Sequence, residues 1–142
     1  MKTIFATFIV LLLLTTAATA NAQSIDKLAA KLSKAFEAKT FAALDADKAT
    51  SGSVQVTLEH SLGGRSTVKS FKNLTAVERW LKGREHDGGP ARNGPAVKRC
   101  NKGTCTYDIN GLLHNNLYLK RITYGYRGKR PLITTIRIRD GD

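Results

Sequence analysis

The feature that most constrains the fold is a series of alternating segments joined by short turns. Apolar and polar side chains alternate from Val54 to His60, which is typical of a strand with one buried face. Gly63 and Gly64 then provide the positive φ angles that a tight hairpin turn needs. Further extended segments follow at 66–71, 97–109, 117–126 and 132–140. Strands joined by short turns pair antiparallel, so we expect a mainly antiparallel sheet.

Helical segments precede and interrupt this series. Ser24 can cap a first helix, and a short second helix is predicted after Thr40. Thr75 and Glu78 match a capping box at the start of a third helix, which Gly83 would end. The first helix places its apolar side chains on one stripe: Ile25, Leu28, Leu32, Ala35 and Phe36. The predicted fold class is α+β, with N-terminal helices packed on a curved, mainly antiparallel sheet.

Alternation also predicts which side chains share a face of the last two strands. One side of the first of them would carry Tyr118, Ile122, Tyr124 and Tyr126. In the closing strand, one face would carry Leu132, Ile136 and Ile138, and the other Ile133, Thr135, Arg137 and Arg139. The glycine- and proline-rich stretch 83–96 is predicted to be an exposed loop.

The N-terminal segment has the features of a secretory signal peptide. Lys2 gives a positive start, an apolar run of 11 residues covers 4–14, and Ala20-Asn21-Ala22 is a small-residue cleavage pattern. A membrane anchor is the alternative, but a span needs about 20 apolar residues. We expect cleavage near Ala22 and a single mature domain, 23–142, in the periplasm or the medium, with no membrane span after cleavage.

Positive charge is concentrated in the second part of the chain. The whole chain has a formal charge of +12. Residues 23–60 contain five bases and five acids, whereas residues 61–142 contain 17 bases against six acids. Such asymmetry predicts a surface that attracts anions, such as nucleic acid, lipid headgroups or an acidic protein. Colloidal solubility of a secreted protein explains the charge equally well.

Three parts of the chain resemble the nuclear transport factor 2-like superfamily. They are the segment LSKAFEAKTFAAL (32–44) followed by a strand, the helix 74–82, and the closing strands YLKRITYGYRGKRPLITTIRIRDGD (118–142). The resemblance implies a cone-shaped sheet around a long helix, with an apolar pocket at its open end. It also implies that a homodimer through the sheet is allowed. That superfamily includes enzymes and non-enzymes, so the fold alone does not assign a function.

Cys100 and Cys105 flank a tight predicted turn. In an oxidising compartment such a pair forms a disulfide, and the small loop limits its stabilisation to about 2 kcal/mol. A redox pair or a zinc site fits less well, because the CxxC spacing and further ligands are missing. We therefore predict a structural disulfide and no metal or other cofactor.

The three histidines offer the only acid–base candidates that we single out. His60 shares a strand face with Val54, Val56 and Leu58, so it would act as a general base if that face lined a pocket. A hydrogen-bonded core or rim histidine is the alternative. His86 falls in the predicted loop and His114 in a turn. Two histidines with a nearby cation would also suit ribonuclease chemistry, although nothing in the sequence fixes that geometry.

The closing strands interleave cations with aromatic residues. The cations are Lys120, Arg121, Arg127, Lys129, Arg130, Arg137 and Arg139, and the tyrosines are Tyr118, Tyr124 and Tyr126. Such a surface holds single-stranded nucleic acid by stacking and charge. The alternative is a solvated sheet face with the tyrosines in the core.

We therefore expect an exported, non-enzymatic domain that binds a small ligand or a protein partner. Phe36, Phe41, Trp80 and Tyr118 are candidates for lining its pocket, and packing in the core is the alternative for most of them. The alternatives are a small enzyme (an isomerase or hydrolase using His60, or a ribonuclease) and an anionic-surface binder that uses Lys120, Arg121, Arg137 and Arg139. Asn73 begins a glycosylation sequon, which matters only in a eukaryotic source.

Overall fold

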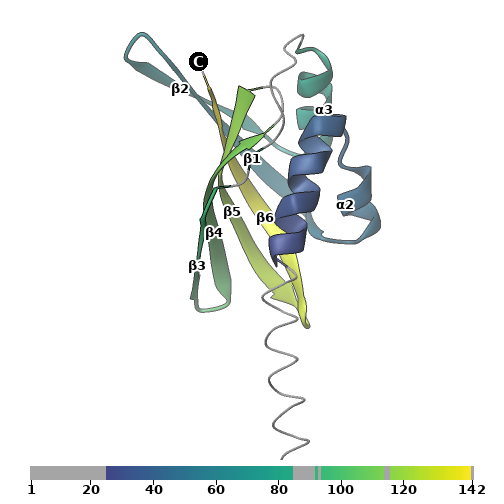
Figure 1. Cartoon of the computed structure of the whole chain (residues 1–142). Helices are drawn as coiled ribbons and strands as arrows, with labels where there is room; N and C mark the ends of the chain where they lie inside the picture. The colour runs from purple at the N-terminus through teal and green to yellow at the C-terminus, as the bar shows by residue number, and fades with distance from the viewer. Residues whose placement is uncertain (1–24, 85–91, 93, 114–115, 142) are drawn as a thin grey trace, which may run out of the picture.

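The computed structural model describes residues 25–84, 92, 94–113 and 116–141. Within these residues, three helices precede or interrupt six strands (Figure 1). The helices are the N-terminal helix (25–38), α2 (Ala42–Ala46) and α3 (Leu74–Lys82). The strands are β1 (Thr50–Leu62), β2 (Arg65–Phe71), β3 (Ala96–Asn101), β4 (Thr104–Leu113), β5 (Leu117–Arg127) and β6 (Arg130–Asp140). The predicted signal peptide, most of the predicted loop, His86 and His114 lie outside the described residues.

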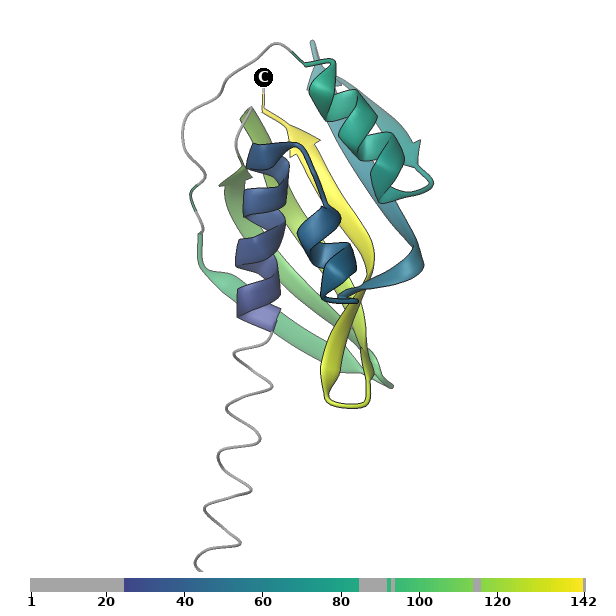
Figure 2. The ribbon, with the colours of Figure 1, turned by 90° about the vertical axis from the view of Figure 1, so that its right-hand side faces the viewer.

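The six strands form one curved sheet in the order β2-β1-β6-β5-β4-β3. Every neighbouring pair is antiparallel except β1 and β6, which run parallel. All three helices lie on the same face of this sheet (Figure 2). The predicted α+β class, with helices on a curved and mainly antiparallel sheet, is therefore confirmed.

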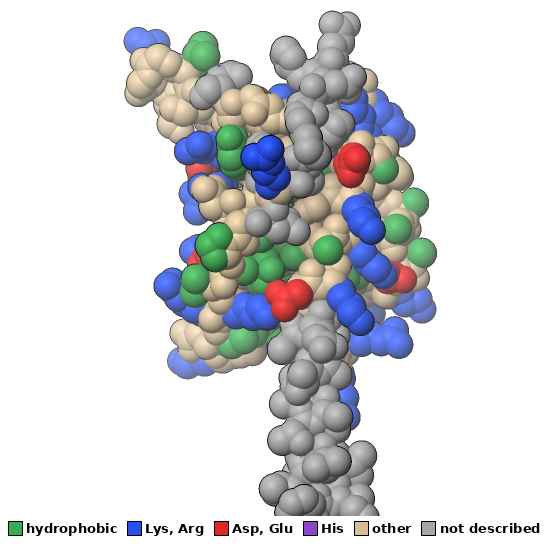
Figure 3. Space-filling model, viewed as in Figure 1, with side chains coloured by type: hydrophobic (Ala, Val, Ile, Leu, Met, Phe, Trp, Pro, Cys, Tyr) green, Lys and Arg blue, Asp and Glu red, His purple; other side chains and the backbone are tan. Residues whose placement is uncertain are grey.

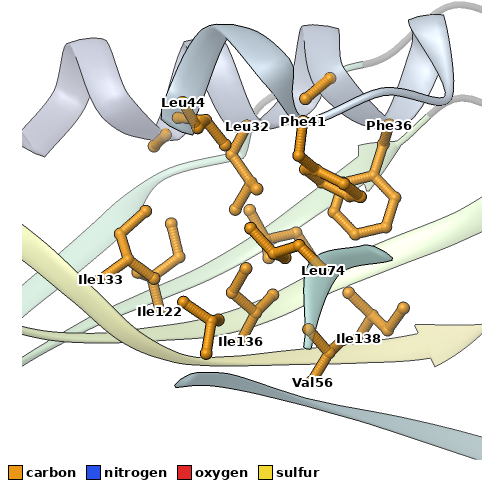
Figure 4. Packing of buried hydrophobic residues seen from close by; sticks show 14 of the residues in the cluster. Leu32, Phe36, Phe41, Leu44, Val56, Leu74, Ile122, Ile133, Ile136 and Ile138 are labelled. Atoms are coloured by element: carbon orange, nitrogen blue, oxygen red, sulfur yellow. The ribbon is translucent and has the colours of Figure 1, made fainter. Parts of the chain in front are cut away.

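One apolar core joins the helices to the sheet. The predicted stripe of the N-terminal helix is buried, and Leu32 and Phe36 have no exposed surface. Figure 4 shows these side chains with Phe41 and Leu44 above the sheet residues Ile122, Ile133 and Ile136. Burying a large aliphatic or aromatic side chain contributes about 1.5–3 kcal/mol, so this layer is the main source of stability. No helix in the described part of the chain is long and apolar enough to cross a membrane.

The predicted hairpins are confirmed, because each turn brings residues of positive φ between paired strands. Gly63 and Gly64, with φ of 58° and 80°, join β1 to β2. Lys102 and Gly103 join β3 to β4 in the same way. The turn before Arg130 joins β5 to β6.

Two predicted strand faces are wrong, because each strand has an irregularity that exchanges its faces. The pairing of β5 with β6 shifts between Leu119 and Arg121, so Tyr118 lies on the face opposite Ile122. A second shift, between Thr123 and Tyr124 of β5, leaves Thr134 of β6 as the extra residue. As a result Ile133 is buried with Ile136 and Ile138, whereas Leu132 is only half-buried. Strict alternation cannot anticipate such bulges.

The predicted helix caps are also partly wrong. Asn73, not Thr75, caps α3, and its side chain accepts a hydrogen bond of 2.9 Å from the Ala76 N–H. Glu78 instead accepts a 2.7 Å hydrogen bond from the N–H of Phe41, the residue before α2. Thr40 is not the cap residue of α2, although its hydroxyl accepts a hydrogen bond of 3.5 Å from Ala42 N–H. Glu78 therefore links two helices rather than closing a capping box.

Candidate functional site: the basic end

The predicted pocket residues do not gather in one place. Phe36 and Phe41 are completely buried and contact each other edge to face, with ring centroids 5.2 Å apart. Trp80 is half-buried and packs on Phe71, 5.4 Å between centroids. Tyr118 lies across the sheet from the helices, because of the register shift in β5. The two phenylalanines thus act as core residues.

His60 lies at the end of the sheet where β6 finishes. Its Nδ1 is 3.5 Å from Oδ2 of Asp140, and Arg84 donates two hydrogen bonds to the same carboxylate, at 3.0 and 3.3 Å. The Arg84 guanidinium also stacks over the Trp80 ring, 4.8 Å from its centroid. Glu59 points away from His60, as predicted, and binds Arg137.

Asp140 is held as a carboxylate by these neighbours. Burial opposes its ionisation, but the hydrogen bonds and charge of Arg84, with the charge of His60, lower the pKa of Asp140 below its usual value of 3.8. A carboxylate already bound by a guanidinium is a poor proton acceptor. The cluster therefore acts first as a link between α3, β1 and β6.

The predicted disulfide is confirmed. Cys100 and Cys105 are directly opposite each other in the β3–β4 hairpin, with their Cα atoms 4.0 Å apart, and their sulfurs are bonded. Structural disulfides persist in oxidising compartments. The bond therefore fits a periplasmic or extracellular location.

Four of the predicted cations lie on the outer face of the sheet, away from the helices. There Arg121 binds Asp108 and Arg137 binds Glu59. We define the outer-face row as these two arginines and their two acidic partners, which follow one another across β1, β6, β5 and β4. The hydrogen bonds between Arg121 and Asp108 lower the pKa of the Asp108 carboxyl and raise the pKa of the Arg121 guanidinium.

The other two candidates on this face also have neighbours. Lys120 donates a 2.8 Å hydrogen bond to Asn110, and Arg139 lies over the Tyr118 ring, 5.4 Å from its centroid. Carboxylates therefore compensate Arg121 and Arg137, whereas Lys120 and Arg139 contact neutral groups. Alternation correctly placed Arg137 and Arg139 on one face of the closing strand, but it could not predict the acidic partners.

The remaining three cations of the closing strands lie elsewhere, in the turn between β5 and β6. That turn approaches the start of the N-terminal helix and the segment after α2 (Figure 2). We define the basic end as the six cations that meet there: Lys27, Lys31, Lys48, Arg127, Lys129 and Arg130. Lys and Arg side chains are visible in this region in Figure 3, over the helices and at the lower end of the molecule.

Two adjoining hollows mark this end. The larger, of about 550 Å³, is lined by Lys27, Leu28, Lys31, Ala46, Asp47, Lys48, Ala49, Arg130 and Pro131. The smaller, of about 410 Å³, is lined by Asp45, Lys48, Thr50, Ser51, Gly52, Val54, Asn73, Leu74, Thr75 and Arg127. Lys48 belongs to both, and each hollow receives one arginine from the β5–β6 turn.

Local structure explains how these cations meet. Lys27 and Lys31 are one turn apart on the exposed side of the helix that buries Leu28. The backbone of Ala49 accepts a 2.8 Å hydrogen bond from the Ile133 N–H, which holds the segment containing Lys48 against the start of β6. Segments far apart in sequence therefore bring their positive charges to one place.

Charge at the basic end is mostly unpaired. Lys31 forms an ion pair with Asp47. Among the residues that the structure describes, the other five cations have no carboxylate within 4.0 Å. Sequence reasoning missed half of this site, because Lys27, Lys31 and Lys48 belong to the segment with no net charge. Only the fold reveals that they join the β5–β6 turn.

Comparisons with known proteins identify the fold. No protein-family model and no curated protein matches the chain. Similar solved structures include an NTF2-like protein of unknown function from Shewanella baltica, at 7% identity and a TM-score of 0.61, covering 84% of this chain and 93% of that one. Another of unknown function, from Silicibacter pomeroyi, has 8% identity, a TM-score of 0.61, and coverage of 86% and 97%.

A third similar structure extends the likeness over more of this chain. It is an NTF2-like protein with a cystatin-like fold from Novosphingobium aromaticivorans, at 12% identity and a TM-score of 0.57. The alignment covers 92% of this chain and 88% of that chain. At such identities the likeness concerns architecture, not activity. The chain therefore has the nuclear transport factor 2-like (NTF2-like) fold that its sequence resembled.

Proposed function

We propose that this protein is an exported, non-enzymatic accessory domain that binds an anionic partner through its basic end. One observation carries the proposal. Four exposed cations without described acidic partners converge from three segments of the chain on two adjoining hollows, and Lys129 lies between two of them in the β5–β6 turn. The outer-face row, by contrast, has a carboxylate for each of its arginines.

Such a cluster does not benefit the fold by itself. Like charges held close together repel, and a surface with uncompensated charge attracts counterions of the opposite sign. A polyanion that displaces these counterions gains affinity from their release. Binding of an anionic partner therefore explains the cluster, whereas a contribution to folding stability does not.

The disulfide supports the exported part of the proposal, because it fits the oxidising compartment that the predicted signal peptide implies. His60 lies beside Asp140, and a carboxylate in that position can orient a histidine as a general base. Catalysis by His60 remains the alternative, and replacement of His60 by alanine with loss of an activity would establish it.

Binding of fluorescein-labelled heparin to the mature chain tests the proposal. The variant combines Lys27→Gln, Lys48→Gln and Arg130→Gln. Each cation at an anionic surface is worth about 1 kcal/mol, so we expect affinity to fall about hundredfold. The slope of log affinity against log salt should become shallower by about 2 to 3.

A matched control removes the same charge from β2 and α3. Arg65, Arg79 and Lys82 are exposed and line neither hollow, and replacing all three by glutamine should lower affinity by less than about threefold. Equal losses in both triple variants would mean that net charge, not the basic end, governs binding. Heparin binding that is independent of salt would contradict the proposal.

A further inference from the structure

We infer that the anionic partner of the basic end is a membrane surface rich in phosphate headgroups. This inference rests on the proposed function, because it names the partner of the same site. It is carried by two observations at this end of the molecule: the apolar lining beneath the cations, and an exposed tyrosine beside them.

The larger hollow is amphipathic. Its charged lining consists of the unpaired cations Lys27, Lys48 and Arg130 and the Lys31–Asp47 ion pair. Its apolar lining includes Leu28, Ala49 and Pro131. Leu28 and Ala49 are almost fully buried, so they form the floor rather than the rim. A phosphate headgroup pairs with ammonium and guanidinium groups, and the glycerol and upper acyl carbons next to it suit an apolar floor.

Tyr126 provides the second observation. It lies directly across the β5–β6 hairpin from Pro131, next to Arg127, and is 43% exposed. Its ring contacts that of the buried Tyr124, 5.7 Å between centroids, which fixes its position. Tyrosine with an apolar ring and a polar hydroxyl is enriched where proteins meet the headgroup region of a bilayer.

Single-stranded nucleic acid fits this end less well. Such ligands stack successive bases on exposed aromatic rings. Among the large apolar side chains that the described residues expose, Tyr126 is the aromatic one. The rings of Trp80 and Tyr118 lie away from the basic end, and each already carries a guanidinium over one face.

Flotation of the mature chain with lipid vesicles tests the inference. One set contains phosphatidylcholine with phosphatidylglycerol, and the other contains phosphatidylcholine alone. Each Lys or Arg that reaches an anionic surface strengthens binding about fivefold, so the Lys27→Gln, Lys48→Gln, Arg130→Gln variant should bind the anionic vesicles about hundredfold more weakly. The matched control variant in β2 and α3 should bind them nearly as wild type.

Tyr126→Ser separates a membrane from a soluble polyanion. We expect this variant to lose about fivefold or more in affinity for anionic vesicles, because burying an aromatic ring at the interface contributes to binding. It should bind labelled heparin as wild type does. Circular dichroism would check that the exposed position leaves the fold intact.

The outcomes separate this inference from the proposed function. Binding of heparin or an oligodeoxynucleotide through the basic end, with equal binding to both vesicle types, would overturn the membrane inference and leave the proposed function standing. Soluble glycerol 3-phosphate that competes fully at millimolar concentration would likewise assign the site to a free phosphate compound. Failure to bind any of these anions would overturn both.

Discussion

Two groups of cations, each with members from the closing strands, behave differently in the fold. The outer-face row places Arg137 and Arg121 next to each other between Glu59 and Asp108, so each arginine has a carboxylate on its other side. The basic end gathers cations that, apart from Lys31, have no acidic partner among the described residues. Net charge alone therefore does not locate a binding surface. What matters is whether the fold supplies opposite charges nearby.

The largest expected effect concerns a cation that is fully engaged. Arg84 binds Asp140 and stacks on Trp80, and its side chain is 15% exposed. Removing one partner of a largely buried ion pair leaves a charge uncompensated, so Arg84→Gln should lower the free energy of unfolding by about 3 kcal/mol. Chemical denaturation measures this loss. Unchanged heparin affinity in the same variant would sharpen the contrast between engaged and free cations.

The acid side of the same cluster predicts a pH dependence. Because the pKa of Asp140 is lowered in the folded state, its contribution to stability is present above the ordinary value of 3.8 and is lost as the pH falls through the lowered value. Asp140→Asn should cost about 2 kcal/mol at neutral pH and flatten the decline in acid. Thermal melts across acidic pH test this. A variant that declines as steeply as wild type would assign the acid sensitivity to other groups.

Removing the acids of the outer face tests this comparison directly. If the ion pairs prevent Arg121 and Arg137 from binding heparin, then combining Glu59→Gln with Asp108→Asn should raise heparin affinity about tenfold. Stability should change by less than about 1 kcal/mol, because these pairs are largely exposed. Anisotropy titrations compare the double variant with wild type. No gain in affinity would show that the position of a cation on the molecule, rather than its pairing with an acid, determines whether it binds heparin.

The smallest effect lies within the basic end itself. Asp47→Asn removes the partner of Lys31, and should raise affinity for anionic vesicles about twofold to fivefold. Both side chains are nearly half exposed, so the unfolding free energy should change by less than about 0.5 kcal/mol. Weaker binding by this variant would mean that Asp47 positions Lys31 rather than neutralising it.

The sequence predicted the elements of the fold well, because hydrophobic periodicity and turn residues are local signals. The stripe of the N-terminal helix and the Gly63-Gly64 turn are where the pattern placed them. Tyr118 and Ile133 were assigned to the wrong faces, since the bulges that exchange faces depend on how β5 and β6 pair. Glu78 bonds to Phe41, a residue distant in sequence, in place of its own helix end.

The candidate site was harder to predict than the fold. Arg127, Lys129 and Arg130 were recognised as basic, but their neighbours Lys27 and Lys48 come from a segment that is neutral overall. The acids that neutralise Arg121 and Arg137 come from two other strands. Both facts depend on which residues distant in sequence meet in the fold, and counting charges along the chain does not reveal this.

The parallel pairing of β1 with β6 has a consequence for the order of folding. β6, which covers Arg130–Asp140, lies between β1 and β5 and is the only link between the β2-β1 and β5-β4-β3 halves of the sheet in the described residues. β6 follows the other five strands in the sequence, so it is made after them. Because distant segments must close a long loop before they pair, assembly of the sheet waits for β6. A nascent chain that still lacks it has two separate hairpin systems and no common core.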